Sequence, residues 1–429
     1  MNILVVGGGG REHAIIRKLK ESPEVETIYA LPGNGGIAAD AQCFPIAATD
    51  VEGIANFAAS HEIGFAVVAP DDPLAMGCVD RLHEMGIPCF GPEARAAQIE
   101  ASKVFAKDLM KKYNIPTAKY ETFSDPAEAE AYALAGRFPV VVKADGLALG
   151  KGVLICETPE AAKSAIRSIM LDRQFGESGS RVVIEEFLTG PEVSVLAFTD
   201  GKVVRPMKSS MDHKRAGDGD TGLNTGGMGT IAPNPFYTPE IAERCMREIF
   251  LPTIEAMNAE GRTFRGCLYF GLMLTPDGPK VIEYNCRFGD PETQVVLPLL
   301  KSDLLTIMRA CESGTLADVE VEFDGGAACC VIVASGGYPE KYEKGKVISL
   351  NGAEDAENVR VYHSGTALKG GALVTAGGRV LGVTAAAPAL EAAISDAYAA
   401  ARKVSFEGAY MRGDIGRRAL GALSRDDKE

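Results

Sequence analysis

The sequence predicts a multidomain protein of mixed α/β and α+β class, and three observations support that prediction. The chain has 429 residues, of which 46% are hydrophobic. It is too long for one hydrophobic core, so we expect roughly two to four domains. Up to about residue 90, short apolar runs alternate with helical patterns, which is typical of a doubly wound parallel sheet. From about residue 326 a new apolar segment, GAACCVIVASGGYP, begins a smaller α+β unit.

The composition argues against several classes of function. The net charge is −14, from 44 Lys and Arg against 58 Asp and Glu, and the pI is about 5.0. A diffuse negative field disfavours nucleic-acid and membrane-surface partners. The start of the chain lacks the pattern of a signal peptide, and no apolar run reaches the roughly 20 residues of a membrane helix. The ten cysteines are scattered without a C-x-x-C pair, which suits a reducing compartment. We therefore expect a cytoplasmic protein.

Two glycine-rich loops follow the first two predicted strands. The first, GGGGREHA at residues 7–14, begins a helix, and backbone N–H groups in such a turn can bind a phosphate. It does not fit a nicotinamide-dinucleotide site, because Glu12 or His13 stands at the third glycine position and the second strand ends without an acidic residue. The second loop, PGNGG at residues 32–36, lies at the same edge of the sheet. The pair favours a small phosphorylated substrate, unless the glycines serve only tight turns.

A lysine interrupts the apolar strand within FPVVVKADGLALGKGVLI, residues 138–155. A buried ammonium group is costly unless an anion pairs with it, so we expect Lys143 to meet a phosphate. Gly150, Lys151 and Gly152 follow in a glycine-rich loop that does not match a Walker A motif. We expect this loop to cover phosphates in another way, although such hairpins are also common surface turns.

The next segment, RVVIEEFLTGPEVSV at residues 181–195, has an apolar strand that ends in glutamates. A purine could lie against the apolar residues with its edge at the backbone of Glu185 and Leu188, while Glu192 accepts hydrogen bonds from ribose hydroxyls. A strand end with surface glutamates has the same pattern. This segment therefore supports a nucleotide site only because it lies between the phosphate loop and the polar strand near residue 283.

The segment VIEYNCRFGDPETQ, residues 281–294, carries Glu283, Asn285 and Arg287 at alternate positions. Alternate side chains of a strand lie on one face, so these three should project together. A solvated face of an edge strand is the alternative. Cys286 points the other way and is expected to pack in the interior.

The ordered set of motifs resembles the phosphoribosylamine–glycine ligase (glycinamide ribonucleotide synthetase) family of the ATP-grasp superfamily. SKVFAKDLM, VVKADGLALGKGV, EEFLTGPE, DHKRAGDGDTGLNTGGMG and EYNCRFGDPETQ follow the two N-terminal loops in this order, and the resemblance extends to RGDIGRRAL near the C-terminus. It implies a Rossmann-like substrate domain at 1–100, an ATP-grasp domain at 101–325 and a C-terminal domain at 326–429. Residues 120–190 would be a mobile subdomain that covers the nucleotide.

The resemblance implies an activity in purine biosynthesis. The family joins glycine to 5-phosphoribosylamine with ATP, giving glycinamide ribonucleotide, ADP and phosphate, and a glycyl phosphate intermediate requires no protein nucleophile. The implied cofactors are ATP and Mg²⁺, for which Mn²⁺ could substitute. The partners would be these small molecules, with no nucleic acid and no membrane. We expect a monomer that makes at most transient contact with the enzyme supplying phosphoribosylamine.

The resemblance also implies roles for individual residues. Glu283 and Asn285 match the metal ligands, and the strand before them, GCLYFGLML, adds no acidic ligand. Asp212 and Asp290 are assigned to the glycine ammonium group, and Arg287 to its carboxylate or to the transferred phosphate. The catalytic set is Arg287, Lys143 and Asp212. The nucleotide set is Lys103, Lys143, Gly150, Lys151, Gly152, Glu185, Glu186, Leu188 and Glu192, and the substrate set is Gly9, Gly10, Arg11, Glu12, Asn34, Gly35, Asp212, His213, Lys214, Arg287 and Asp290.

The segment from 212 to 229 is polar, glycine-rich and too long for a simple turn, so we expect a binding loop or lid. His213 is predicted to hydrogen-bond within this lid rather than to shuttle protons. Two departures from the family pattern stand out. Asp71 and Asp72 replace a glutamate–alanine pair, which puts a contact with the ribose amine in question, and Leu223 replaces a proline of the lid.

Two other functions remain open at this point. A related ATP-grasp ligase or carboxylase of purine intermediates would keep the nucleotide residues but should lack RFGDPETQ and DHKR. A catalytically silent nucleotide-binding or scaffold protein would bind the nucleotide without turnover.

Overall fold

The N-terminal residues form a five-stranded parallel sheet with the order β3-β2-β1-β4-β5. The computed structural model describes residues 1–147 and 152–426, except for the side chains of 425 and 426. The strand order reverses between β1 and β4, and open α/β sheets bind ligands at the carboxyl ends of such strands. The predicted doubly wound sheet is confirmed. Its elements are β1 Asn2–Gly7, α1 Gly10–Leu19, β2 Thr27–Pro32, β3 Gln42–Cys43, α2 Val51–Ser60, β4 Ile63–Val68, α3 Asp71–Ala75, α4 Cys78–Glu84, β5 Cys89–Phe90 and α5 Ala94–Ala101.

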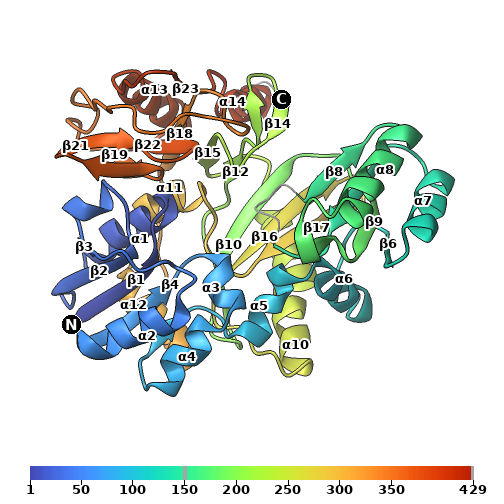
Figure 1. Cartoon of the computed structure of the whole chain (residues 1–429), viewed down its shortest axis with the longest axis horizontal. Coiled ribbons are helices and arrows are strands. Elements are labelled where there is room, and N and C mark those ends of the chain that lie inside the picture. Colours follow the sequence, from blue (N-terminus) through green and yellow to red (C-terminus); the bar gives the residue numbers. More distant parts are fainter. Residues whose placement is uncertain (148–151, 427–429) are drawn as a thin grey trace.

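Residues 120–186 form a separate antiparallel sheet with the order β6-β9-β7-β8. Two helices pack on it around a small hydrophobic core of their own, which includes Val142, Ile166 and Ile184. Figure 1 shows this unit on the opposite side of the molecule from the N-terminal sheet. Its elements are β6 Tyr120–Phe123, α7 Pro126–Ala135, β7 Val140–Ala144, β8 Val153–Cys156, α8 Pro159–Ile166 and β9 Val182–Glu186.

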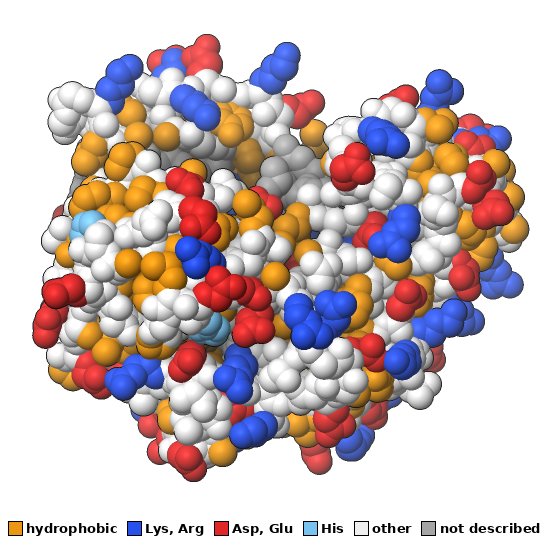
Figure 2. All heavy atoms as spheres, turned by 60° about the horizontal axis from the view of Figure 1, so that its bottom comes forward, with side chains coloured by type: hydrophobic (Ala, Val, Ile, Leu, Met, Phe, Trp, Pro, Cys, Tyr) orange, Lys and Arg blue, Asp and Glu red, His pale blue; other side chains and the backbone are white. Residues whose placement is uncertain are grey.

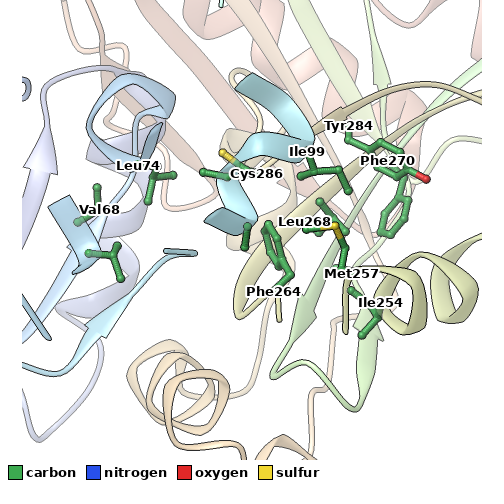
Figure 3. Packing of buried hydrophobic residues seen from close by; sticks show 14 of the residues in the cluster. Val68, Leu74, Ile99, Ile254, Met257, Phe264, Leu268, Phe270, Tyr284 and Cys286 are labelled. Carbon is green, nitrogen blue, oxygen red and sulfur yellow. The ribbon is translucent and has the colours of Figure 1, made fainter. Parts of the chain in front are cut away.

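A second antiparallel sheet, with the order β11-β10-β16-β17, lies between these two units. Its core is continuous with that of the N-terminal sheet: Figure 3 shows Val68 and Leu74 on one side, Phe270 and Tyr284 on the other, and Ile99 between them. The two units therefore share one interior. The elements are α6 Lys103–Lys112, β10 Glu192–Thr199, β11 Val204–Pro206, α9 Pro239–Cys245, α10 Leu251–Ala259, β16 Gly266–Thr275, β17 Gly278–Asn285, α11 Thr293–Val296 and α12 Leu304–Ser313.

The C-terminal sheet includes two strands from much earlier in the chain. Its order is β12-β15-β18-β22-β19, with β23 paired to β18. β12 and β15 are the ends of the predicted lid, so the lid is anchored in the C-terminal sheet. The elements are β12 Met211–Asp212, β13 Arg215–Gly217, β14 Thr221–Asn224, β15 Gly229–Ala232, β18 Ala327–Ser335, β19 Val359–His363, β20 Thr366–Lys369, β21 Ala372–Thr375, β22 Arg379–Ala387, α13 Leu390–Ala401, β23 Ala409–Tyr410 and α14 Arg417–Asp426.

The structure confirms the predicted mixed fold class, with an N-terminal parallel sheet, two antiparallel sheets in the central part and a C-terminal α+β part. The N- and C-terminal units are stacked on one side, and the β6–β9 unit faces them (Figure 1). Figure 2 shows a hollow in the surface between these two sides. Within the described residues, no helix has the length and apolar character needed to cross a membrane.

Candidate active site

Strand β17 places Glu283 and Asn285 on one face at the end of the central sheet. Gly271 pairs with Glu283 while Leu272 pairs with Val281, so Ile282 forms a bulge that shifts the register by one residue. Past this bulge the side chains alternate as predicted. Tyr284 and Cys286 are buried in the core, whereas Glu283, Asn285 and Arg287 are only half-buried. Figure 3 shows Cys286 among the apolar side chains, in agreement with its expected packing role.

A buried glutamate, Glu100 at the end of α5, fixes the side chains after Glu283. Its Oε1 accepts a hydrogen bond from Asn285 Nδ2 at 2.8 Å and forms an ion pair with Arg287 Nη2 at 2.9 Å, and its Oε2 accepts the Cys286 N–H at 2.7 Å. With Nδ2 held in this way, Asn285 Oδ1 accepts no hydrogen bond from any described residue. The Asn285 oxygen is thus oriented as an available acceptor beside Glu283.

Arg287 is held between acidic groups. Burial lowers its pKa, but Glu100 and Asp71 outweigh burial and raise the pKa above the ordinary arginine value. Burial also raises the Glu100 pKa, against the effect of Arg287. The family departure at Asp71 therefore contributes charge at Arg287, from the first residue of α3 at the carboxyl end of β4.

Lysines gather at the facing ends of β7 and β9. Lys143 Nζ lies 2.9 Å from Glu185 Oε1 and donates to the Ile282 carbonyl at 3.0 Å, and Lys107 Nζ lies 3.2 Å from the same carboxylate oxygen. Burial lowers the pKa of Lys107 to about 8. Lys103, at the start of α6, donates to the Gly146 carbonyl at 2.7 Å, and burial lowers its pKa as well. Three ammonium groups and one buried carboxylate leave net positive charge for an anionic ligand.

The other predicted nucleotide residues lie along the same edge. Glu186 accepts the Lys119 N–H at 3.0 Å, Leu188 is half-buried and Glu192 is exposed at the start of β10. The carbonyl of Gly152 accepts the Ala144 N–H at 2.9 Å, which pairs the loop ends. Gly150 and Lys151 lie outside the described residues.

Lys214 connects the predicted metal ligand to the predicted ribose ligand. Its Nζ is 3.3 Å from Glu283 Oε1 and 3.4 Å from Glu192 Oε2. Lys214, followed by Lys143, lowers the pKa of Glu283 to about 2 against the effect of burial. Glu283 is therefore ionised at neutral pH, which is the state that a metal ligand needs.

The predicted lid folds back on Asp212. A Cβ atom on Gly227, which has a φ of +112°, would come within 2.7 Å of Asp212 Oδ1 and 2.5 Å of Pro291 Cδ, so only glycine fits there. Burial and the charge of Glu292 raise the pKa of Asp212 well above its usual range. His213 lies 3.0 Å from the Gly229 carbonyl through Nδ1 and accepts the Gly416 N–H through Nε2 at 3.2 Å. Both of its ring nitrogens are thus used in holding the lid.

At the N-terminal loop, the carboxylate of Glu12 occupies the first turn of α1. Glu12 accepts the Gly9 N–H at 2.6 Å and the Arg11 Nε–H at 2.7 Å, and Arg11 Nη1 donates to the Phe288 carbonyl at 3.1 Å. A Cβ atom on Gly10 would lie 2.5 Å from Ser364 Oγ, because the C-terminal part crosses the start of the helix. A phosphate at this turn would have to share its donors with Glu12.

The second loop contacts the C-terminal part directly. Asn34 Nδ2 donates to the carbonyls of Gly8 at 2.9 Å and His363 at 2.7 Å, and the Gly35 N–H donates to the Thr366 carbonyl at 3.0 Å. These two predicted substrate residues therefore join the N-terminal loop to the segment after β19.

Asp290 is held by residues that the sequence did not indicate. Gln294 Nε2 donates to Asp290 Oδ1 at 2.7 Å, and Arg379 Nη2, from β22, lies 3.3 Å from Oδ2. Arg379 and Glu100 were both missed by the sequence analysis. The sequence did contain a signal for Glu100, because it is a charged residue on the apolar face of the helix ARAAQIEA, next to Ile99. It contained none for Arg379, which stands at the start of an apolar strand, where surface residues are common.

Comparison with known proteins gives a consistent family assignment. Three family models match the chain: the phosphoribosylglycinamide synthetase N domain at residues 1–100, its ATP-grasp (A) domain at 101–293 and its C domain at 328–418. The phosphoribosylamine–glycine ligase of Vibrio vulnificus is 48% identical over 423 residues, covering 98% of this chain and 99% of that protein. That of Chlorobaculum tepidum is 48% identical over 425 residues, covering 98% and 100%.

Solved structures agree with these matches. The phosphoribosylamine–glycine ligase of Thermotoga maritima has a TM-score of 0.85 and 35% identity, covering 97% of this chain and all of that one. The biotin carboxylase domain of the Hydrogenobacter thermophilus 2-oxoglutarate carboxylase, solved with MgADP, has a TM-score of 0.72 at 17% identity and covers 95% and 91% of the two chains. The second likeness concerns the fold alone.

Proposed function

Since the chain belongs to the phosphoribosylglycinamide synthetase family, we infer that it is the ATP-dependent ligase that joins glycine to 5-phosphoribosylamine, giving glycinamide ribonucleotide, ADP and phosphate in purine biosynthesis. The single observation that best supports this chemistry is the pair of lysines around Glu283: Lys143 donates to the Ile282 carbonyl beside it at 3.0 Å, and Lys214, two residues after Asp212, lies 3.3 Å from Glu283 Oε1. Phosphate-binding, metal-binding and amine-binding groups thus line one edge of the sheets.

The reaction needs an activated carboxyl group, because the negative charge of glycine carboxylate repels an attacking amine. A carboxylate oxygen of glycine attacks the γ-phosphorus of ATP, and the bond to the bridging oxygen of ADP breaks. The 1-amino group of phosphoribosylamine then attacks the acyl carbon of glycyl phosphate, loses a proton and expels inorganic phosphate. Catalysis is positioning and charge stabilisation, for which Lys143 and Arg287 are the assigned cations.

The residues at β17 fit a magnesium ion. Glu283 is ionised, and Glu100 holds the amide nitrogen of Asn285, which leaves the Asn285 amide oxygen available. Carboxylate and amide oxygens are the hard donors that Mg²⁺ prefers. No cluster of three His, Cys, Asp or Glu able to hold a metal occurs in the described part of the chain, so the nucleotide phosphates would supply the remaining ligands. Bound Mg²⁺, or Mn²⁺ in its place, would neutralise charge on the transferred phosphoryl group.

The two substrates are assigned to neighbouring carboxylates and glycine turns. Asp290, whose pKa is held below its ordinary value, supplies the negative charge opposite the glycine ammonium group, and Asp212, whose pKa is raised, accepts a hydrogen bond from the same group. Arg287 faces the glycine carboxylate. Phosphoribosylamine binds at the crevice between β1 and β4, near Gly9 and Glu12. A carboxylate in that turn suits an amine better than a phosphate, so the ring amine, rather than the 5-phosphate, is placed beside Glu12.

We propose three domains, at 1–100, 101–325 and 326–429, with residues 120–190 as the nucleotide cover. The lid strands β12 and β15 are shared between the second and third domains.

All ten cysteines are free, and nine are buried, which supports a reducing, cytoplasmic setting. We propose that the protein acts as a monomer on small molecules, in transient contact with the enzyme that supplies the amine.

The direct test is phosphate release from ATP and Mg²⁺ with glycine and freshly made phosphoribosylamine, omitting each in turn. We expect turnover only with both substrates, and a loss of at least about 100-fold for Glu283→Ala. Glu391→Ala, an exposed glutamate on α13, serves as the matched control and should retain full rate. Turnover with another acid or amine would indicate a related ATP-grasp ligase, and nucleotide binding without turnover would indicate a silent protein.

A further inference from the structure

Arg379, the first residue of β22, joins three segments that are distant in the sequence. Its Nη1 donates to the carbonyl of Gly226 in the lid at 2.7 Å and to the carbonyl of Asp290 at 2.9 Å, and its Nη2 lies 3.3 Å from Asp290 Oδ2. Figure 1 shows α11, which follows Asp290, lying beside β22 and β15 of the C-terminal sheet. One guanidinium group therefore ties the C-terminal sheet to both the lid and the start of α11.

Arg379 holds Gly226 of the lid, and the next residue, Gly227, packs on Asp212. Gly227, next to Gly226, closely approaches both Asp212 and Pro291. A second C-terminal residue holds the same position, since the Gly226 N–H donates to the Tyr338 hydroxyl at 2.9 Å. The position of the lid over Asp212 thus depends on two contacts from the C-terminal part.

Gly226 lies directly against the guanidinium group. A Cβ atom there would come within 2.9 Å of Arg379 Cζ and 3.1 Å of its Nη2. The first contact is closer than real Cβ atoms show and the second is tight, so a methyl group at residue 226 would push the guanidinium aside. The absence of a side chain at Gly226 therefore leaves room for Arg379 Nη1 to reach both carbonyl groups.

We propose that Arg379 is the positioning residue of the glycine subsite: it keeps Asp290 ionised and in place, and it holds the lid so that Asp212 faces the same ammonium group. This inference rests on the proposed function. Arg379 acts through Asp290 and Gly226 and does not touch the reacting atoms. A buried carboxylate without a cation would take up a proton and lose its attraction for an ammonium ion.

The test is the steady-state kinetics of Arg379→Gln, with Arg379→Lys as a second variant that keeps the charge but loses the two-pronged geometry. We expect the KM for glycine to rise at least 10-fold for the glutamine variant, and less for lysine, while the KM for ATP stays within twofold. Arg17→Gln is the matched control. Arg17 also bridges the N- and C-terminal parts, through Asp40 at 3.0 Å and Glu354 at 2.5 Å, but it does not contact Asp290, so its loss should leave the KM for glycine unchanged.

A pH profile separates this role from a merely structural one. Burial raises the pKa of Asp290, but Arg379, followed by Arg11, Gln294 and Arg287, lowers it below the ordinary value. The ionised form is lost as pH falls through that pKa. Without Arg379 the pKa rises, so the KM for glycine of Arg379→Gln should climb with falling pH at a higher pH than in the wild type. Tyr338→Phe, which removes only the lid contact, should leave the pH profile unchanged.

Gly226→Ala provides an independent variant if Arg379→Gln fails to fold, because it displaces the guanidinium without removing it. A several-fold rise in the KM for glycine would support the proposal. An unchanged KM for glycine and an unchanged pH profile in folded variants, with wild-type turnover of glycine intact, would overturn it. If the wild-type protein itself did not turn over glycine, the proposed function would fail instead, so the two failures are distinguishable.

Discussion

At the scale of single residues, the nucleotide end of the site depends on how two lysines share one carboxylate. Lys143 and Lys107 both lie within about 3.2 Å of Glu185 Oε1, which is 3% exposed. The carboxylate offsets one of the two positive charges and leaves the other for an anion. A second donor of Lys143 goes to the Ile282 carbonyl beside Glu283, whereas a second donor of Lys107 goes to Thr117 Oγ1 at 2.8 Å. Lys143 therefore faces β17, the strand of the proposed metal ligands, and Lys107 faces the base of the β6–β9 unit.

Lys143→Met and Lys107→Met should consequently behave differently. Loss of Lys143 removes a cation beside the transferred phosphoryl group, and we expect kcat to fall by roughly 100- to 1,000-fold with Glu185 still paired to Lys107. Loss of Lys107 should lower the thermal unfolding midpoint while changing kcat less than 10-fold. Phosphate-release kinetics and thermal unfolding of both variants check the contrast, and equal kinetic losses would contradict it.

At the scale of elements, β17, the strand that carries the proposed metal ligands, is supported by a helix of another unit. Helix α5 belongs to the N-terminal sheet, yet its Glu100 accepts hydrogen bonds from Asn285 and Cys286 at the end of β17 and forms an ion pair with Arg287. Ile99, on the same helix, lies in the core shared by both units (Figure 3). The orientation of the Asn285 amide is thus set by packing between units, in the way that outer groups commonly orient metal ligands.

Glu100→Gln is the test of that support. A glutamine has one acceptor oxygen and no charge, so its amide nitrogen would face either the Cys286 N–H or both Asn285 Nδ2 and Arg287. We expect the Mg²⁺ concentration for half-maximal activity to rise by about 10-fold or more, with a smaller change in the KM for ATP at saturating Mg²⁺. Glu93→Gln, an exposed change at the start of the same helix, should leave the Mg²⁺ dependence as it is. An unaltered Mg²⁺ requirement in Glu100→Gln would remove Glu100 from the metal site.

The same elements show how far the sequence could predict the structure. Periodicity and glycine turns predicted the parallel sheet, the apolar strand that carries Lys143 and the alternation of Glu283, Asn285 and Arg287, because these are local properties. The pairing of β15 with β18 joins residues about 100 positions apart, and nothing local in a four-residue strand indicates its partner. The bulge at Ile282 depends on the pairing of β17 with β16, and the role of Arg379 depends on contacts between units. A single sequence encodes neither in a readable pattern.

At the scale of the whole molecule, the N- and C-terminal units are joined by a buried histidine pair. His13 Nδ1 accepts the His363 N–H at 2.8 Å, and His13 Nε2 lies 2.9 Å from Asp40 Oδ2. Since Nδ1 acts as acceptor, the proton is on Nε2 and the neutral ring donates to Asp40. Protonation of His13 would abolish the bond to His363. Because the C-terminal unit also anchors the lid through β12 and β15, this interface supports the substrate site at a distance.

Acidification should therefore weaken the interface over a defined range of pH. Burial, followed by repulsion from His13 once that ring is protonated, lowers the pKa of His363 to about 4 from an ordinary 6.5, and burial lowers the pKa of His13 as well. The native state binds fewer protons than the unfolded state between these values, so the contribution of His363 is fully present above pH 6.5 and is lost as pH falls towards 4. It amounts to about 3 kcal/mol at most.

Urea unfolding at several pH values between 7.5 and 4.5 measures this loss. His363→Gln should start from a lower midpoint at pH 7.5 but lose less stability on acidification than the wild type, since one of the two buried histidines no longer has to remain neutral. His61→Gln, which changes a histidine of the N-terminal unit outside the interface, should retain the wild-type loss. A wild-type slope in His363→Gln would place the acid sensitivity elsewhere, in the carboxylates of the interface such as Asp40 and Glu354, whose pKa values are held below their ordinary range by His13 and Arg17.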